Sequence, residues 1–280
     1  MKPSPLHNKV VAITGACGGF GAALCRALYE RGANIAMFDI DNAALAKQLQ
    51  HYPDTARVKT WHANVSELDS LRNAMNSAAS HFGGIDVVIA NAGIDLIEAL
   101  SADGDDNFDR VIDINLNGVW RTFRAALPHV QASKGYLLAV SSMAAFVHSP
   151  LQASYAASKA GVWALSNSIR LELRQHGVAV GSLHPTFFKT PLLHNISGNA
   201  AGNALWGGHQ KFPFKTVSID DVVLAAIKAI EIRANITTVP RINGIIANMP
   251  GLLRRFVEGI GFKDQTIRSA MAFANQKTKP

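Results

Sequence analysis

Residues 141–159 read "SSMAAFVHSPLQASYAASK", with a pair of serines near one end and Tyr155 four residues before Lys159 at the other. Residues four apart share one face of a helix, so the phenol and the ammonium can lie side by side. A phenol has a reference pKa of about 10, and a nearby ammonium is expected to lower it toward neutral pH. The pair can therefore exchange a proton with a bound molecule, although Tyr-x-x-x-Lys is also a common pattern on helix surfaces.

A glycine-rich turn near the N-terminus could bind a phosphate group. The apolar run "KVVAI" (9–13) leads into "TGACGGFGAAL", in which Gly15, Gly19 and Gly21 have the spacing G-x3-G-x-G. Glycines allow a tight turn and a close approach of a pyrophosphate to the N-terminus of the following helix, where N–H groups favour anions. The spacing differs from the usual G-x-G-x-x-G, and a plain strand-to-helix turn is the alternative.

Asp39 strengthens the case for a dinucleotide. It ends the second strand-like run, eighteen residues beyond Gly21 (39 − 21), where a carboxylate can accept hydrogen bonds from ribose hydroxyls. A carboxylate there also repels a 2′-phosphate, and the neighbouring Cys17, Gly18 and Ile40 supply no cation. The sequence therefore favours NAD over NADP, with a solvated aspartate at a strand end as the alternative.

Apolar runs typical of strands alternate with segments typical of helices. The strand-like runs are residues 9–13, 34–38, 57–62, 86–90, 136–140 and 178–183. Most are continuously apolar, which indicates burial on both faces, as in a parallel sheet. The helical segment between the third and fourth runs opens on a capping-box-like Ser66-x-x-Asp69 and closes on Gly83-Gly84. The alternation predicts an α/β fold: a single-domain, Rossmann-like, doubly wound parallel β-sheet flanked by helices.

Two regions depart from this alternation. Residues 186–216 are long and irregular, which is typical of a lid or binding loop, and we expect a substrate loop there. Residues 241–280 are basic and apolar and form a C-terminal extension beyond a domain of residues 1–240. The extension could cover the pocket, join a subunit interface or rest on a membrane surface.

In their order and placement, these motifs resemble the short-chain dehydrogenase/reductase family over roughly residues 8–240. The turn Thr14-Gly15-x-x-x-Gly19-x-Gly21, the "NAG" at 91–93 and the "INLNG" at 114–118 are similar to family motifs. The resemblance implies a catalytic tetrad of Asn115, Ser142, Tyr155 and Lys159. Ser142 is preferred to Ser141 because its offset of thirteen residues from Tyr155 (155 − 142) matches the family.

The resemblance also implies roles for these residues. Tyr155 would exchange the proton, and Lys159 would hold a ribose hydroxyl and lower the tyrosine pKa. Ser142 would orient the substrate oxygen, and Asn115 would position a water. The expected cofactor contacts are Thr14, Gly15, Cys17, Gly19, Phe20, Gly21, Asp39, Asn64, Val65, Asn91, Ala92, Gly93, Tyr155, Lys159, Pro185 and Thr190. Two positions depart from the family pattern: Asn64 stands where an aspartate is common, and Thr186 where a glycine usually follows the proline.

The expected substrate pocket is mostly apolar. Its residues are Met143, Phe146, His148, Phe187, Phe188 and Leu192. These segments contain no cluster of Arg or Lys that would indicate a substrate with a phosphate or carboxylate group. The leading hypothesis is an NAD-dependent oxidoreductase that interconverts a lipophilic secondary alcohol, steroid-like or long-chain, and a ketone. The alternatives are an NADPH-dependent carbonyl reductase and a non-catalytic dinucleotide-binding sensor.

Composition and charge argue against several other classes of function. The 280 residues carry a formal charge of +7, but Lys and Arg are scattered, so no basic stripe indicates nucleic acid. The two cysteines and the dispersed histidines form no disulfide framework or metal-ligand spacing, and no metal is expected. The absence of a signal peptide or an eighteen-residue apolar run predicts a cytoplasmic protein. The family resemblance implies a homodimer or homotetramer built on helices around residues 107–130 and 154–175.

Overall fold

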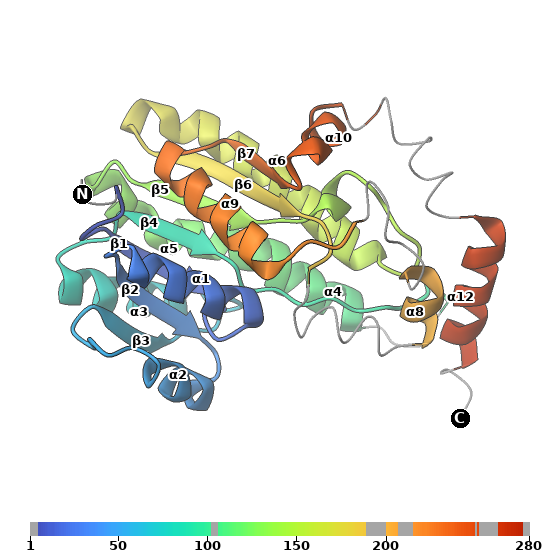
Figure 1. Cartoon of the computed structure of the whole chain (residues 1–280), viewed down its shortest axis with the longest axis horizontal. Coiled ribbons are helices and arrows are strands. Elements are labelled where there is room, and N and C mark those ends of the chain that lie inside the picture. The colour runs from blue at the N-terminus through green and yellow to red at the C-terminus, as the bar shows by residue number, and fades with distance from the viewer. Residues whose placement is uncertain are drawn as a thin grey trace.

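The fold is built on a seven-stranded sheet in which all neighbouring strands are parallel (Figure 1). A computed structural model describes residues 5–101, 106–188, 200–206, 215–249, 251 and 263–276. The strand order is β3-β2-β1-β4-β5-β6-β7, so the order reverses between β1 and β4. The strands are β1 Val10–Thr14, β2 Asn34–Asp39, β3 Val58–His62, β4 Val87–Ala90, β5 Tyr136–Val140, β6 Ala179–Pro185 and β7 Ile236–Val239.

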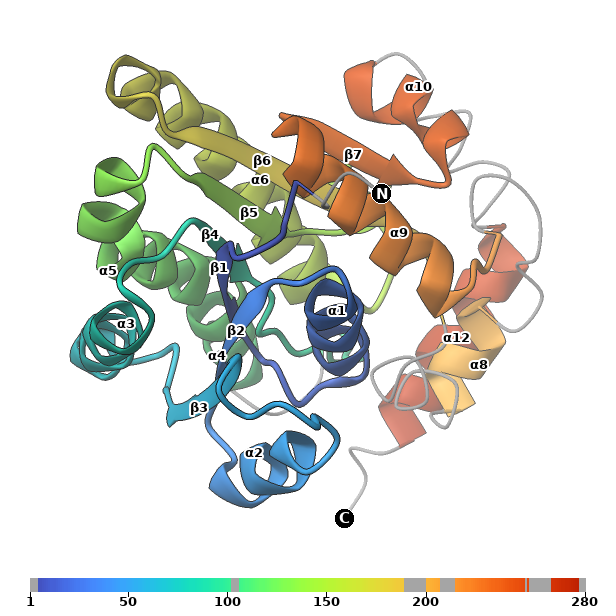
Figure 2. The same ribbon diagram turned by 60° about the vertical axis from the view of Figure 1, so that its left-hand side comes forward.

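Helices cover both faces of the sheet (Figure 2). Helices α1 (Gly19–Glu30) and α9 (Ile219–Ile232) lie on one face, and α3 (Leu68–Phe82), α5 (Gly118–Ala132) and α6 (Ala153–Leu173) lie on the other. Side chains alternate accordingly along β1: Val11 and Ile13 pack under α1 and α9, whereas Val10 and Ala12 pack under α3, α5 and α6. The predicted Rossmann-like doubly wound sheet is confirmed.

Two local predictions were wrong or incomplete. Ser66 does not cap α3, because the helix begins at Leu68 with Glu67 as N-cap, and the Ser66 side chain hydrogen-bonds Asp113 instead. Strand β7 was not predicted, since its sequence ITTV is short and only half buried at the edge of the sheet. By contrast, α3 ends as predicted on Gly83, whose φ of 81° is a left-handed conformation that suits glycine.

The described part of the C-terminal extension contributes two α-helices, one of which, α12 (Asp264–Gln276), lies beside α8 (Ala200–Trp206) at one end of the molecule (Figure 1). Helix α12 packs on α8, while α10 (Gly244–Asn248) follows β7. All three helices contribute to a hydrophobic cluster with Met143 and Phe146, which follow β5. No helix within the described ranges is long and apolar enough to cross a membrane.

The helices expected to form subunit contacts carry large exposed apolar side chains. These are Phe108 in α4 (Asp106–Ile112), Trp120 in α5 and Leu171 in α6. Their exposure suits an interface between copies of the chain. The oligomeric state stays a prediction.

Candidate active site

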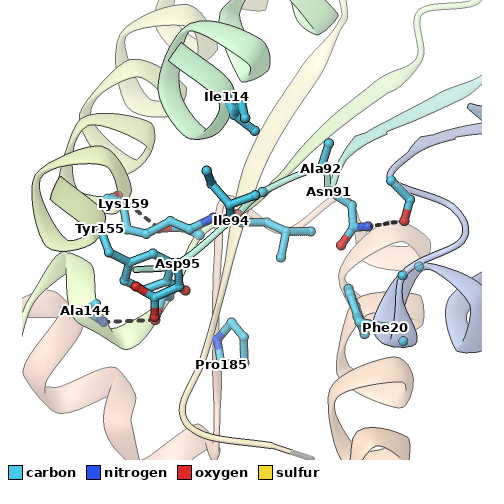
Figure 3. A pocket seen from close by; sticks show the side chains of 18 of the residues that line it. Phe20, Asn91, Ala92, Ile94, Asp95, Ile114, Ala144, Tyr155, Lys159 and Pro185 are labelled. Carbon is cyan, nitrogen blue, oxygen red and sulfur yellow. Dashed lines mark hydrogen bonds between the residues drawn. The ribbon is translucent and has the colours of Figure 1, made fainter. Parts of the chain in front are cut away.

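One cavity of about 730 Å³ opens at the carboxyl ends of the strands, where the chain order of the sheet reverses. In parallel α/β sheets, this is the edge at which ligands bind. Segments that follow β1 to β6 line the cavity, and α6 adds Tyr155 and Lys159 (Figure 3). The glycine turn and the Ser-Tyr-Lys group, which are far apart in sequence, therefore face the same cavity.

Two glycines of the turn, Gly15 and Gly21, have no room for a side chain. Gly15 has a φ of 63°, and a Cβ there would lie 2.9 Å from the Cα of Ala92. A Cβ on Gly21 would collide with the Gly15 carbonyl oxygen and lie 2.9 Å from Nδ2 of Asn91. Asn91 also ties the turn to β4, because its Nδ2 donates to the carbonyl oxygens of Thr14 and Gly15, both at 3.0 Å. Thr14 adds a further link between the turn and the segment after β4, because its buried Oγ1 accepts a hydrogen bond from the Asn91 backbone N–H.

Helix α1 begins at this turn in a way that fits a dinucleotide pyrophosphate. Its N-cap is Gly18, which is exposed to the cavity, no side chain caps the helix, and the first turn carries no acidic residue. The N–H groups and the positive end of the helix dipole therefore remain available for an anion. Phe20 is buried and packs edge-on against Phe188 at a centroid distance of 5.8 Å.

Two backbone N–H groups hold the Asp39 carboxylate beside the glycine turn. Its Oδ2 accepts from the backbone N–H of Cys17 at 2.9 Å, and its Oδ1 accepts from that of Asp41 at 3.2 Å. Burial and the Asp39 carboxylate raise the pKa of the Cys17 thiol to about 12, so the thiol stays neutral. A carboxylate has about four acceptor sites, so Asp39 keeps capacity for ribose hydroxyls. Ala63, Asn64 and Val65 line the cavity beside it.

The side chains of Ser142 and Tyr155 lie next to each other in the cavity wall. Ser142 leaves β5 in extended conformation, and its Oγ accepts from the backbone N–H of Ala144 at 3.1 Å. Its hydroxyl also hydrogen-bonds the phenol of Tyr155, which lies in the first turn of α6. Because Ala144 fixes the Oγ position, the serine and tyrosine hydroxyls form one polar pair that a substrate oxygen can approach.

Lys159 lies beneath Tyr155 and is almost fully buried, with an exposed fraction of 5%. Its Nζ donates to the Val140 carbonyl oxygen at 2.9 Å and lies 5.5 Å from the centroid of the Tyr155 ring. Burial lowers the pKa of Lys159 to about 8, and the carboxyl of Asp95 opposes this effect. The lysine can therefore change protonation state near neutral pH.

The electrostatics of Tyr155 differ from the prediction. Burial raises the pKa of the phenol well above its usual range, the Asp95 carboxylate raises it further, and the Ser142 hydrogen bond lowers it. The expected lowering by Lys159 is absent because the ammonium is directed to the Val140 carbonyl and not to the phenol oxygen. In this state Tyr155 is protonated at neutral pH.

Asn115 lies behind the cavity and not on its surface. It is fully buried in a π-helical turn, Asp113–Asn117, and such turns are frequent at functional sites. Its Oδ1 accepts from the Ile94 N–H and its Nδ2 donates to the Ile94 carbonyl, both at 2.8 Å. Its Nδ2 also donates to Oγ of Ser158 at 3.2 Å. Asn115 thus fixes the segment after β4 against helix α6.

The expected substrate residues divide into three groups. Met143, Phe187 and Phe188 line the cavity, as does Pro185 from the cofactor set. Phe146 does not, because it is buried against Trp163 and His184, and His148 is exposed outside the cavity lining. Thr190 and Leu192 lie outside the described residues.

Sequence reasoning missed Asp95 and Gln152, which both line the cavity. Asp95 is buried, and its carboxyl lies close enough to Tyr155 and Lys159 to raise the pKa of both. The available signal was its position: it follows "NAGI" directly, at the carboxyl end of a strand, where an acidic side chain must face either solvent or the site.

The chain matches known oxidoreductases in sequence. The family model of short chain dehydrogenases matches residues 9–201. The (-)-trans-carveol dehydrogenase of Rhodococcus erythropolis is 38% identical over 208 residues, which cover 68% of this chain and 74% of that protein. The L-fucose dehydrogenase of Mus musculus is 30% identical over 198 residues, which cover 69% of this chain and 70% of that protein.

A solved structure shares the fold over most of its length. The 3-ketoacyl-(acyl-carrier-protein) reductase from Brucella melitensis, complexed with NADH, has a TM-score of 0.73 and 25% sequence identity to this chain. The match covers 84% of this chain and 97% of that one. The chain therefore belongs to the short-chain dehydrogenase/reductase family, whose members bind a nicotinamide dinucleotide and act on CH–OH or carbonyl groups.

Proposed function

We propose that this protein is an NAD-dependent dehydrogenase that interconverts a secondary alcohol and a ketone. The observation that carries the proposal is the meeting of Ser142, Tyr155 and Lys159 with the glycine turn around one cavity. The bound dinucleotide supplies the hydride acceptor or donor. The remaining tasks belong to the chain: binding, orientation and proton transfer.

Tyr155 and Ser142 handle the substrate oxygen in this proposal. Both hydroxyls can hydrogen-bond that oxygen, and Ser142 stabilises the negative charge that develops on it. The raised pKa of Tyr155 keeps the phenol protonated, so it can donate a proton to a carbonyl oxygen during reduction. During oxidation the proton moves the other way, so the phenol must first give up its own proton. The neutral amine form of Lys159, which becomes populated as the pH rises through its pKa of about 8, can take up that proton.

The cavity walls support a lipophilic substrate. Met143, Val147, Phe187 and Trp206 give the substrate side an apolar lining. Burial of apolar surface then supplies most of the binding free energy, at about 25 cal/mol per Å². The similarity to a relative named for carveol supports an alcohol substrate for this chain.

The preference for NAD rests on Asp39. Its carboxylate and that of Asp41 both line the cavity beside the glycine turn, and a 2′-phosphate there would meet like charges. We expect kcat/KM for NAD to exceed that for NADP by about tenfold or more. In Asp39→Asn this preference should shrink, because one charge and one ribose acceptor are lost.

Steady-state kinetics with both cofactors test the preference, with Asp54→Asn as the matched control. Asp54 is half exposed and pairs with Arg57 outside the cavity lining, so its variant should keep the wild-type ratio. A wild-type enzyme that prefers NADP would overturn the assignment and favour an NADPH-dependent carbonyl reductase. Cofactor binding without turnover of any alcohol or ketone would indicate a dinucleotide-binding sensor.

A further inference from the structure

Asp95 is a buried acid on the wall of the active-site cavity, with an exposed fraction of 7%. It follows β4, and Nε2 of Gln152 donates to its Oδ2 at 2.7 Å, while the Leu96 backbone N–H also stabilises the charged carboxyl. Its Oδ1 is buried, and no group in the described part of the chain makes a hydrogen bond to it. Buried polar atoms are almost always hydrogen-bonded, so an orphan acceptor beside a reaction centre requires an explanation.

The polar side chains around Asp95 hydrogen-bond one another. Oε1 of Gln152 accepts from Ser149 Oγ at 2.7 Å and from Trp206 Nε1 at 3.2 Å. Gln152 is itself 4% exposed, so its amide is fixed with Nε2 toward Asp95. This network orients the aspartate and leaves Oδ1 as the acceptor without a hydrogen bond among the described residues.

We propose that Asp95 is a specificity-determining residue whose Oδ1 accepts a hydrogen bond from a second hydroxyl of the substrate. The preferred substrate is then a diol or a hydroxyketone with a lipophilic body. This inference rests on the proposed alcohol dehydrogenase function and narrows its substrate class. Asp95 lies close to Tyr155 in the cavity wall, so the second hydroxyl lies near the reacting carbon (Figure 3).

The local geometry and charge favour a neutral donor. The terminal torsion of an aspartate is broad, and a rotation about it moves both carboxyl oxygens together. The hydrogen bond from Gln152 is short at 2.7 Å, so a small rotation that presents Oδ1 to the cavity leaves Oδ2 within hydrogen-bond distance of Nε2. The Lys159 ammonium acts on the same carboxyl and would repel a cationic substrate group. A hydroxyl carries no such penalty, and it satisfies the orphan acceptor on binding.

Ionisation of Asp95 provides a second signature. Burial raises the pKa of this carboxyl to about 7, while Gln152, the Leu96 backbone N–H and Lys159 favour the charged form. A charged acceptor makes the stronger hydrogen bond, so the preference for a second hydroxyl should increase as pH rises through 7. Tyr155 and Lys159 also titrate, but they act on the reacting oxygen of every substrate and cancel in a ratio.

The experiment compares cyclohexanol with the isomeric cyclohexanediols as substrates of the full-length enzyme with NAD. For the best diol isomer, kcat/KM should exceed that for cyclohexanol by about tenfold, beyond the statistical factor from two reactive hydroxyls. In Asp95→Ala the ratio should fall to that statistical factor. Asp95→Asn preserves the shape of the side chain, and in this variant the ratio should fall and no longer depend on pH. Asp69→Asn, an exposed carboxylate on α3, is the control and should keep the wild-type ratio.

Calorimetric binding of the same alcohols in the presence of NADH separates the two proposals, because oxidation cannot proceed with the reduced cofactor. Turnover without a diol preference would overturn the role of Asp95 and leave the proposed function standing. A diol preference in binding that requires Asp95, without turnover, would support the subsite and overturn the proposed function. Tighter binding of aminocyclohexanol than of any diol would assign Asp95 to an ammonium group and overturn the hydroxyl proposal.

Discussion

Substitution Tyr155→Phe is expected to lower kcat for alcohol oxidation by about 10²- to 10⁴-fold, the usual contribution of a general acid–base group. The phenol oxygen is the group that meets Ser142 in the cavity, and phenylalanine removes only that oxygen. The ring and its packing over Lys159 remain, so the Kd of NAD should change little. Stopped assays of NADH formation, together with calorimetric titration of NAD, check both halves of this expectation.

Tyr29→Phe is the matched control. Tyr29 lies in α1 outside the cavity lining, and its hydroxyl accepts a backbone hydrogen bond from Asp54 at 3.2 Å. The control should lose some stability and keep wild-type kcat. Unchanged kcat in Tyr155→Phe would remove Tyr155 as the proton-transferring group.

Substitution Lys159→Met is expected to reduce kcat by about 10²-fold or more. Methionine keeps much of the side-chain volume but removes the ammonium that lies beneath the Tyr155 ring and donates to the Val140 carbonyl. Without that charge and its titration near pH 8, the phenol loses its proton-relay partner. The same kinetic assay over a pH series measures the effect, and the wild-type rise of oxidation rate with pH through 8 should flatten in the variant.

Lys228→Met controls for the loss of a lysine as such. Lys228 is exposed on α9 and contacts Glu231 only at 4.0 Å, so its variant should match the wild type in kcat and in the pH profile. A Lys159→Met enzyme with normal kcat and a normal pH profile would show that Tyr155 works without the lysine.

The fold was predictable because the sequence repeats one simple signal. Buried parallel strands such as β1, β4 and β5 are continuously apolar, and Gly83 marks the end of α3 between two of the strands. Strand β7 lacks this signal because it lies at the sheet edge with half of its residues partly exposed. Element boundaries such as the start of α3 depend on side-chain partners far away in sequence, as the contact of Ser66 with Asp113 shows.

Sequence motifs predicted the residues of the candidate site that belong to a motif. They did not predict the residues whose position depends on tertiary packing. Ser142, Tyr155 and Lys159 follow from spacing and family resemblance, and the structure brings them together. Whether Phe146 faces the cavity or the core depends on a short helical turn and on the position of His184, which no spacing rule reveals. Asp95 was not predicted, because its burial and its contact with Gln152 arise only when the segment after β4 folds against the start of α6.

The direction of the Tyr155 pKa shows a further limit of sequence reasoning. Helical spacing places an ammonium near a phenol, but it does not fix where the ammonium donates or how much solvent remains. In the folded chain Lys159 donates to Val140, and burial dominates the titration of Tyr155. Desolvation is a property of the whole fold and outweighs a charge whose hydrogen bond is directed elsewhere.

Transfer of an isotope from the substrate carbon to the cofactor reveals whether the enzyme moves a hydride. Cyclohexanol deuterated at its carbinol carbon is incubated with the enzyme and NAD, and the NADH formed is examined by mass spectrometry. We expect the NADH to carry the deuterium, and we expect Tyr155→Phe to form almost no NADH. NADH without deuterium, or the absence of NADH with every cyclic secondary alcohol tested, would contradict an alcohol dehydrogenase built on this site.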